Sequence, residues 1–446
     1  MIIILRLERC RIFVAIILQF YNCGLSNVNL QSKVYAKIPD SSEDDVNLAV
    51  EAARVAFLEW SKTPRAVRSK IMYRAADILE SRLKEFAEAE VRDQGKTIGF
   101  ATNVDITRSV YNLRFFAGHI LHMEEKASFM DGVSLNYVQR NPVGVAGLIA
   151  PEAGLPDGVV NMIFGTGRPI QHLRLIQMDD PFNKHLNICI QRIGATTGQA
   201  LVSHPMVPLI SFTGGTVTGK KINAAASTHL KKVCLELGGK NANIIFEDCD
   251  FEKAVETSIK SSFNNQGEIC LCGSRIFVQS SIYSKFLDAF VPKASSLVVG
   301  DPNDPNTQVG ALISKEHMEK VLGYIELAKS EGGVIECGGQ RKPMEGEFSE
   351  GYFVEPTVIT NVSPSSRVAQ EEIFGPVVTV HPFETEEEVI KLANDSPYGL
   401  SCSVWTRDGS RQRRVAESIY VGTCWVNCWL VRDLRMPFGG MKQSGK

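Results

Sequence analysis

The sequence lacks the features that assign a chain to several common classes of protein. It has 11 cysteines in 446 residues, but no Cys-x-x-Cys pair and no cysteine–histidine spacing of a zinc site, so no metal is expected. No apolar run reaches the ~18–20 residues of a membrane-spanning helix. Its 48 Lys and Arg balance 50 Asp and Glu, which excludes a strongly basic nucleic-acid-binding surface. We expect a globular protein with reduced thiols in the cytoplasm, without nucleic-acid or membrane partners.

The N-terminus contains one apolar run whose meaning stays open. Arginines at positions 6, 9 and 11 precede the run Ile12 to Phe20, and Cys23-Gly24-Leu25-Ser26 follows it. This order is typical of a short secretory signal. The alternatives are an apolar segment that packs within the fold, or a wrongly assigned N-terminus.

Most of the chain alternates between short apolar runs and segments in which apolar residues recur at helical spacing. Short buried runs that end in glycine turns predict strands, and segments with helical spacing follow them. Repeated strand–turn–helix units are typical of an open parallel α/β sheet. The predicted strands are 133–140, 143–150, 159–164, 207–212, 232–237, 242–246 and 275–279. The predicted helices are 44–57, 65–83 with an extension over 84–91, 104–122, 195–203, 218–227, 251–264, 281–297, 314–330 and 385–394.

Residues 168–193 fit neither pattern. They follow Gly165-Thr166-Gly167, a turn that should lead directly into a helix. A structureless stretch of this length is unusual inside a compact sheet.

Cys270 is the first candidate for chemistry. It lies in a turn after the predicted helix 251–264 and before the strand 275–279. A thiol at such a boundary can reach a cleft and act as a nucleophile. The alternative is a small buried hydrophobic residue, which describes most free cysteines.

Glu236 is the second candidate. It lies inside a predicted buried strand, directly before Leu237-Gly238-Gly239-Lys240. A buried carboxyl has a raised pKa, as a general base requires, or is paired in a buried salt bridge.

Three further segments say less when each is taken alone. Gly214-Gly215 stands between a strand and a helix, an arrangement that can bind a phosphate. The acids of Glu371-Glu372-Ile373-Phe374-Gly375-Pro376 read as solvated, and 437–445 reads as a surface turn.

Together these segments resemble the NAD(P)-dependent aldehyde dehydrogenase superfamily. LELGGK, FNNQGEIC, EEIFGP and PFGGMKQSG occur in the family's order, and the resemblance runs with gaps from about Val34 to the C-terminus. It implies an aldehyde dehydrogenase-like α/β fold with a Rossmann-type cofactor domain, an α/β catalytic domain and a small oligomerisation arm. The cofactor domain then covers 30–127 and 142–237, the arm covers 128–141, and the catalytic domain covers 238–446.

The resemblance also implies the roles of the site residues. Cys270 is the nucleophile and Glu236 the general base, Glu372 binds the nicotinamide ribose, and Phe374 lies beside the nicotinamide. The pyrophosphate lies at the helix after Gly214-Gly215, where the family usually has Gly-Ser. The cofactor is NAD, with NADP not excluded. An aldehyde is oxidised to its carboxylic acid through a thiohemiacetal and a thioester on the cysteine.

A narrower resemblance points to the 2-aminomuconic semialdehyde dehydrogenase branch. Asp105 to Ser109, Cys270-Leu271-Cys272 and Asn427 to Arg432 carry it. It implies that Arg108 and Arg432 hold a substrate carboxylate, which a guanidinium can bind bidentately. The alternative for each arginine is a surface ion pair.

The sequence also departs from the family. After Pro151 a βα block of on the order of 30 residues is missing, and with it the implied oxyanion asparagine and ribose-binding lysine. Residues 168–193 resemble an insertion, and the implied last strand of the family's homo-oligomer does not follow Lys446. We expect the missing block to open the sheet and expose an edge. Two alternatives therefore stand: an impaired member that acts as a binding or structural protein, or a cofactor-independent thiol esterase.

Overall fold

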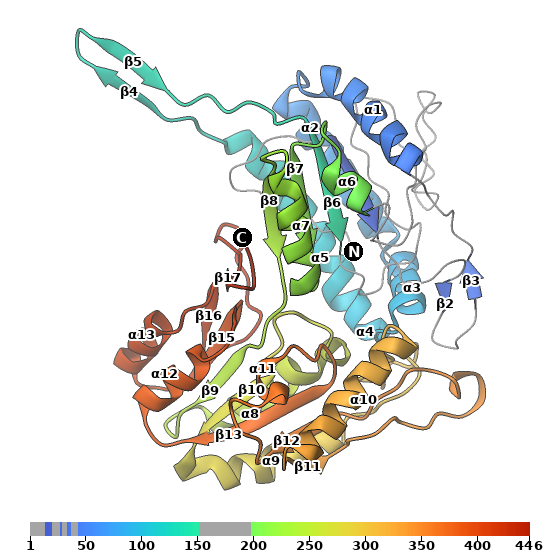
Figure 1. The fold of residues 1–446 in the computed structure, drawn as a ribbon, viewed down its shortest axis with the longest axis vertical. Coiled ribbons are helices and arrows are strands. Elements are labelled where there is room, and N and C mark those ends of the chain that lie inside the picture. The colour runs from blue at the N-terminus through green and yellow to red at the C-terminus, as the bar shows by residue number, and fades with distance from the viewer. Residues whose placement is uncertain (1–13, 20–26, 29–33, 37–42, 151–197) are drawn as a thin grey trace.

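A computed structural model describes residues 14–19, 27–28, 34–36, 43–150 and 198–446 (Figure 1). The junction after Pro151, the stretch 168–193, the predicted strand 159–164 and the first residues of the predicted helix 195–203 lie outside these ranges.

The first sheet has four parallel strands in the order β1-β6-β7-β8. They are β1 (Val14–Gln19), β6 (Val145–Ala150), β7 (Leu209–Thr213) and β8 (Lys232–Glu236). Helices α1 (Glu43–Trp60), α6 (Gln199–Ser203) and α7 (Thr216–Ser227) contribute apolar side chains to its core. The apolar run near the N-terminus thus supplies a strand. One edge of β6 is covered by β1, which pairs with it from Val14 to Gln19.

The second sheet has seven strands in the order β11-β12-β13-β10-β9-β15-β16, with only β11 antiparallel to its neighbour. Their bounds are β9 (Ala242–Ile245), β10 (Arg275–Gln279), β11 (Val334–Cys337), β12 (Thr357–Thr360), β13 (Val377–Phe383), β15 (Ser401–Trp405) and β16 (Thr423–Val426). The α/β fold class with parallel sheets is confirmed.

Helices cover both faces of the second sheet. Successive side chains of a strand point to opposite faces. In β9, Ile245 packs with α8 (Phe251–Phe263) and α9 (Tyr283–Ser295), whereas Ile244 packs with α12 (Glu386–Asn394) and α13 (Gly409–Ser418). Helix α10 (Lys315–Ser330) packs near the β12–β13 end with the short helix α11 (Arg367–Gln370).

A group of helices comes between α1 and β6 along the chain. It contains α2 (Arg65–Ser81), α3 (Leu83–Gln94), α4 (Ile98–Phe100), the π-helical turn η1 (Ala101–Ile106), α5 (Thr107–His119) and the 3-10 turn η2 (Ile120–His122). Gly95, with φ of 79°, is the C-cap that ends α3.

A hairpin projects from the body of the molecule (Figure 1). Its strands are β4 (Ala127–Met130) and β5 (Ser134–Tyr137), and Phe129 and Val133 are 76% and 77% exposed. The remaining strand pairs are β2 (Asn27–Val28) with β3 (Val34–Ala36) and β14 (Tyr398–Gly399) with β17 (Met441–Lys442). Within the described ranges, every helix is too short or too polar to cross a membrane.

We expect the core between α8, α9 and the second sheet to dominate stability. Phe290 is fully buried there, whereas Leu48 on α1 is 61% exposed. Phe290→Ala should lower the free energy of unfolding by about 3–5 kcal/mol, since it leaves a cavity, and Leu48→Ala should change it by less than about 0.5 kcal/mol. Denaturant unfolding measures both, and equal midpoints for the two variants would contradict this assignment of the core.

Candidate active site

The candidate site lies where the chain passes from the first sheet to the second. Strand β8 ends with Glu236, and residues 237–241 lead directly into β9 (Figure 1). The other edge of β8 pairs with the chain end: the N–H of Leu235 donates to Lys446 O at 2.9 Å, and the N–H of Lys446 donates to Leu235 O at 3.0 Å. Glu236 is therefore held in a strand with hydrogen-bonded neighbours on both sides.

Cys270 stands on a turn whose backbone is firmly held. After α8, Asn265, Gln266 and Gly267 have φ of 52°, 44° and 76°, which reverses the chain sharply. The side-chain amide of Asn241 then donates to Cys270 O and to Cys272 O, both at 2.8 Å. These bonds fix the thiol relative to the segment between the sheets.

A second bond holds the same turn from the C-terminal side. The indole N–H of Trp429 donates to Leu271 O at 3.0 Å. Trp429 belongs to the segment that also contains Arg432, so the turn and this segment are positioned together.

The surroundings of Cys270 favour the neutral thiol. The side chain is half-buried, and burial raises the pKa of its thiol to about 12. The carboxyl groups of Glu372 and Glu236 raise this pKa further, while the guanidinium of Arg432 lowers it. Both predicted acids therefore lie close enough to act on the nucleophile electrostatically.

Glu236 has the properties of a buried base. Burial raises the pKa of its carboxyl to about 7, and Arg432 opposes this shift. Its Oε2 atom is buried and has no hydrogen-bond partner among the described residues. This oxygen is free to accept a proton from a water molecule.

Glu372 reaches the same region from the loop after α11. Its Oε1 accepts the N–H of Gly239 at 3.0 Å. Burial raises the pKa of this carboxyl, and the Gly239 N–H, Lys320 and Lys240 lower it. Phe374, two residues later, has φ of 62°.

The helix start at Gly214-Gly215 has free donors. Gly215 is the N-cap of the 12-residue helix α7 and offers no side-chain cap to the first backbone N–H groups. A Cβ built on Gly215 meets no atom within 4 Å, so space is open in front of these donors. Gly214 ties the turn to β8 by donating to Glu236 O at 3.0 Å.

Arg108 and Arg432 approach each other. Each has a lowered pKa, caused chiefly by burial of the guanidinium; that of Arg432 is lowered to about 10, and Arg108 contributes to this shift. Solvent still reaches Arg432, which lies 3.7 Å from the ring centre of Phe438. Neither arginine forms a salt bridge with another described residue, contrary to the surface ion-pair alternative.

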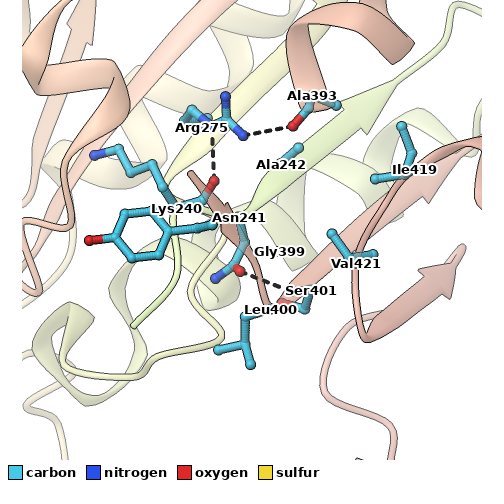
Figure 2. Close-up of a pocket in the computed structure, with 11 residues that line it drawn as sticks. Lys240, Asn241, Ala242, Arg275, Ala393, Gly399, Leu400, Ser401, Ile419 and Val421 are labelled. Carbon is cyan, nitrogen blue, oxygen red and sulfur yellow. Dashed lines mark hydrogen bonds between the residues drawn. The ribbon is translucent and has the colours of Figure 1, made fainter. Parts of the chain in front are cut away.

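Several supporting residues were not predicted from the sequence. Figure 2 shows Arg275 donating to the carbonyl oxygens of Lys240 and Ala393, at 2.9 and 3.0 Å, and Asn241 accepting from the N–H of Ser401 at 3.1 Å. The buried ammonium of Lys240 has no hydrogen-bond partner among the described residues, and burial lowers its pKa to about 7. Asn241 directly follows LELGGK, and this neighbourhood is the sequence signal that could have pointed to it.

Metal binding has no candidate site in the part of the chain that the structure describes, since no group of three or more His, Cys, Asp or Glu side chains there is suitably placed.

Comparison with known proteins identifies the family. The model of the "Aldehyde dehydrogenase family" matches residues 26–151 and 182–446. The chain belongs to the aldehyde dehydrogenase family. The predicted family is thereby confirmed, and the unmatched residues 152–181 adjoin the junction at which the sequence departs from the family.

Curated relatives and solved structures agree with this family. The chain is 47% and 43% identical to the 2-aminomuconic semialdehyde dehydrogenases of Danio rerio and Homo sapiens, over 93% of this chain and 88% of each relative. A putative aldehyde dehydrogenase structure from Burkholderia cenocepacia has a TM-score of 0.85 and 34% identity, covering 95% of this chain and 89% of that one. Betaine aldehyde dehydrogenase of Staphylococcus aureus in complex with NAD+ has a TM-score of 0.83 and 32% identity over the same shares.

The charge of Arg432 should control the reactivity of Cys270. Arg432→Leu removes a cation that lowers the pKa of the thiol, so alkylation of Cys270 at pH 8 should slow by about two- to tenfold. The exposed Arg435, which pairs with Asp433, supplies the matched control Arg435→Leu. Mass spectrometry of the Cys270 peptide after timed iodoacetamide treatment gives the rate, and an unchanged or faster rate in Arg432→Leu contradicts the assignment.

Proposed function

We propose that this chain is an NAD-dependent dehydrogenase that oxidises a carboxylated semialdehyde, such as 2-aminomuconate semialdehyde, to the carboxylic acid. One observation carries the proposal: the buried carboxyl of Glu236 acts electrostatically on the Cys270 thiol, beside two arginines that form no salt bridge with another described residue. The named activity of the relatives at 43–47% identity supports the substrate class. The comparisons give no support to a purely structural protein or to a cofactor-independent esterase.

Cys270 supplies the nucleophile. Its sulfur attacks the aldehyde carbon as the thiol proton is lost, and the product is a thiohemiacetal oxyanion. Backbone N–H groups near Cys270 stabilise the negative oxygen. NAD, when bound, would supply the acceptor for the hydride of this carbon, so that Cys270 would then carry a thioester.

Glu236 completes the reaction. Its carboxylate accepts a proton from water, the resulting hydroxide attacks the thioester carbonyl, and the carbon–sulfur bond breaks. The carboxylic acid leaves and the thiol of Cys270 is restored. With a pKa of about 7, Glu236 is partly ionised at neutral pH and can serve as this base.

The residues present fit NAD at two points. The uncapped, unobstructed start of α7 suits a pyrophosphate, because its backbone N–H groups and helix dipole favour negative charge. Glu372 is held by the N–H of Gly239 and has a second carboxyl oxygen available for a ribose hydroxyl. Phe374 follows on the same loop, beside the expected nicotinamide.

Arg108 and Arg432 select the substrate. Two guanidiniums repel each other, as the lowered pKa of Arg432 reflects, and a carboxylate placed between them removes this repulsion. The arrangement thus favours an aldehyde whose far end is an acid.

The domain division rests on the two sheets. We assign 30–127 and 142–237 to cofactor binding, 238–446 to catalysis, and 128–141 to an oligomerisation arm whose exposed Phe129 and Val133 suit a contact with a second copy. No disulfide joins two of the eight described cysteines, which suits the reducing cytoplasm.

Removal of either reacting group should stop turnover in a distinguishable way. Cys270→Ala should abolish NADH formation and covalent labelling. Glu236→Gln should reduce kcat by about 10²–10⁴ and remove the rise in rate that the wild type shows as pH passes through about 7, since only ionised Glu236 accepts a proton. NADH absorbance from pH 6 to 9 measures both effects; persistent NADH formation by Cys270→Ala contradicts the assigned nucleophile.

The arginines should act most strongly on carboxylated substrates, beyond the effect of about two- to tenfold that Arg432 has on the reactivity of Cys270. Arg108→Leu and Arg432→Leu should each reduce kcat/KM for a carboxylated semialdehyde by about 10- to 100-fold, because a charged hydrogen bond to the carboxylate is lost. An aliphatic aldehyde of similar length without the carboxylate is the control substrate and should lose much less. Equal losses with both substrates would exclude a carboxylate subsite at these arginines.

A further inference from the structure

The turn that holds Cys270 contains a second buried acid, Glu268. Its side chain is only 4% exposed. Oε2 accepts the side-chain N–H of Gln266 at 2.9 Å, and Oε1 accepts the backbone N–H of Ile313 at 3.3 Å. The steps proposed above do not use this acid.

His317 connects Glu268 to the loop on the other side of the site. It lies in the first turn of α10, where its backbone N–H donates to Ser314 Oγ at 3.2 Å. Its Nε2 lies 2.6 Å from Phe374 O and 3.4 Å from Glu268 Oε1. Because a carbonyl oxygen only accepts, Nε2 carries the proton and donates to Phe374 O, and Glu268 Oε1 is a neighbouring polar contact of the same nitrogen.

The two loops also touch directly. A Cβ built on Gly267 would lie 2.1 Å from Gly375 O, so the backbones of the two loops are in close contact. The ring of His317 packs edge-on against that of Phe374, with centroids 6.0 Å apart. The Glu268–His317 pair thus closes a ring of contacts around this junction.

We propose that Glu268, acting through His317, is a positioning residue that fixes the nucleophile turn (residues 264–272) against the cofactor-side loop (residues 371–376). The contacts themselves are independent of any activity. Only the naming of the two loops rests on the proposed function.

The surroundings of Glu268 and His317 favour the neutral form of both side chains. Burial raises the pKa of Glu268 to about 8 and lowers that of His317 to about 4, so both are largely neutral at pH 7. Lys96 and Lys320 face Glu268, and these two cations oppose the rise in its pKa. Lys320 also faces His317 and adds to the lowering of its pKa. Cys272 and Gln266 complete the surroundings of Glu268.

Hydrogen exchange tests the link without any turnover. In Glu268→Ala and in His317→Phe, which keeps a ring but no nitrogen, backbone amides of both loops should exchange at least about tenfold faster. Glu268→Gln, which keeps the acceptor for Ile313 N–H, should stay near the wild type. Glu326→Gln on the exposed part of α10 is the matched control. Faster exchange in only one of the two loops overturns the proposal. If Glu268→Ala fails to fold, the result for His317→Phe decides.

Kinetics separates this inference from the proposed function. Esterase activity of Cys270 toward an activated ester needs the nucleophile turn and Glu236 but not the cofactor-side loop, whereas dehydrogenase activity needs both loops in register. In His317→Phe the dehydrogenase kcat should fall by about tenfold while the esterase rate changes by less than about twofold. Proportional loss of both activities overturns the positioning role. A wild type that forms no NADH refutes the proposed function, and the exchange result still decides the link between the loops.

Discussion

Two glycines between β8 and β9 allow the site segments to come together. A Cβ on Gly238 would lie 2.0 Å from Glu372 Oε2, and one on Gly239 would lie 2.8 Å from Cys270 O. Any side chain here would therefore push the cofactor-side loop or the nucleophile turn away. The same short segment ends the strand that carries Glu236 and continues into Asn241, which holds the Cys270 turn. The segments of the site can come this close because residues 238 and 239 have no side chains.

Burial then decides the charge of the site at rest. It raises the pKa of Cys270 and of Glu236, so the nucleophile is a thiol and the base is only partly ionised. The stabilisation by a neutral Glu236 is complete below the pKa of an ordinary glutamate and is lost as pH rises through about 7. Glu236 therefore ionises, as the proposed base must, over the same pH range in which its ionisation lowers the free energy of unfolding. Arg432 offsets part of this cost, because its cation favours both ionised groups.

Local signals in the sequence predicted elements and motif residues well, and tertiary relations poorly. The strand 275–279 agrees with β10 at both ends, and the helices over 251–264 and 314–330 agree within one residue, because caps and glycine turns are local. The strands of the second sheet after β10 were not predicted, because a short apolar run does not by itself distinguish a strand from a segment of buried helix. Asn241, Glu268 and His317 were missed for a related reason. Their partners lie 29 to 57 residues away in the sequence, and only the fold brings them together.

The arginine pair shows how such distant relations determine specificity. Arg108 comes from the helix that follows the π-helical turn, and Arg432 from the segment that holds Leu271 through Trp429. Burial of the guanidinium and, after it, the charge of Arg108 lower the pKa of Arg432, so the Arg432 cation is less stable in this position than it would be in water. The fold therefore holds two like charges in an unfavourable arrangement that a bound carboxylate would relieve. If the pair binds a substrate carboxylate as proposed, a substrate without that group would gain nothing from it, and the unfavourable charge arrangement in the free protein would become discrimination between substrates.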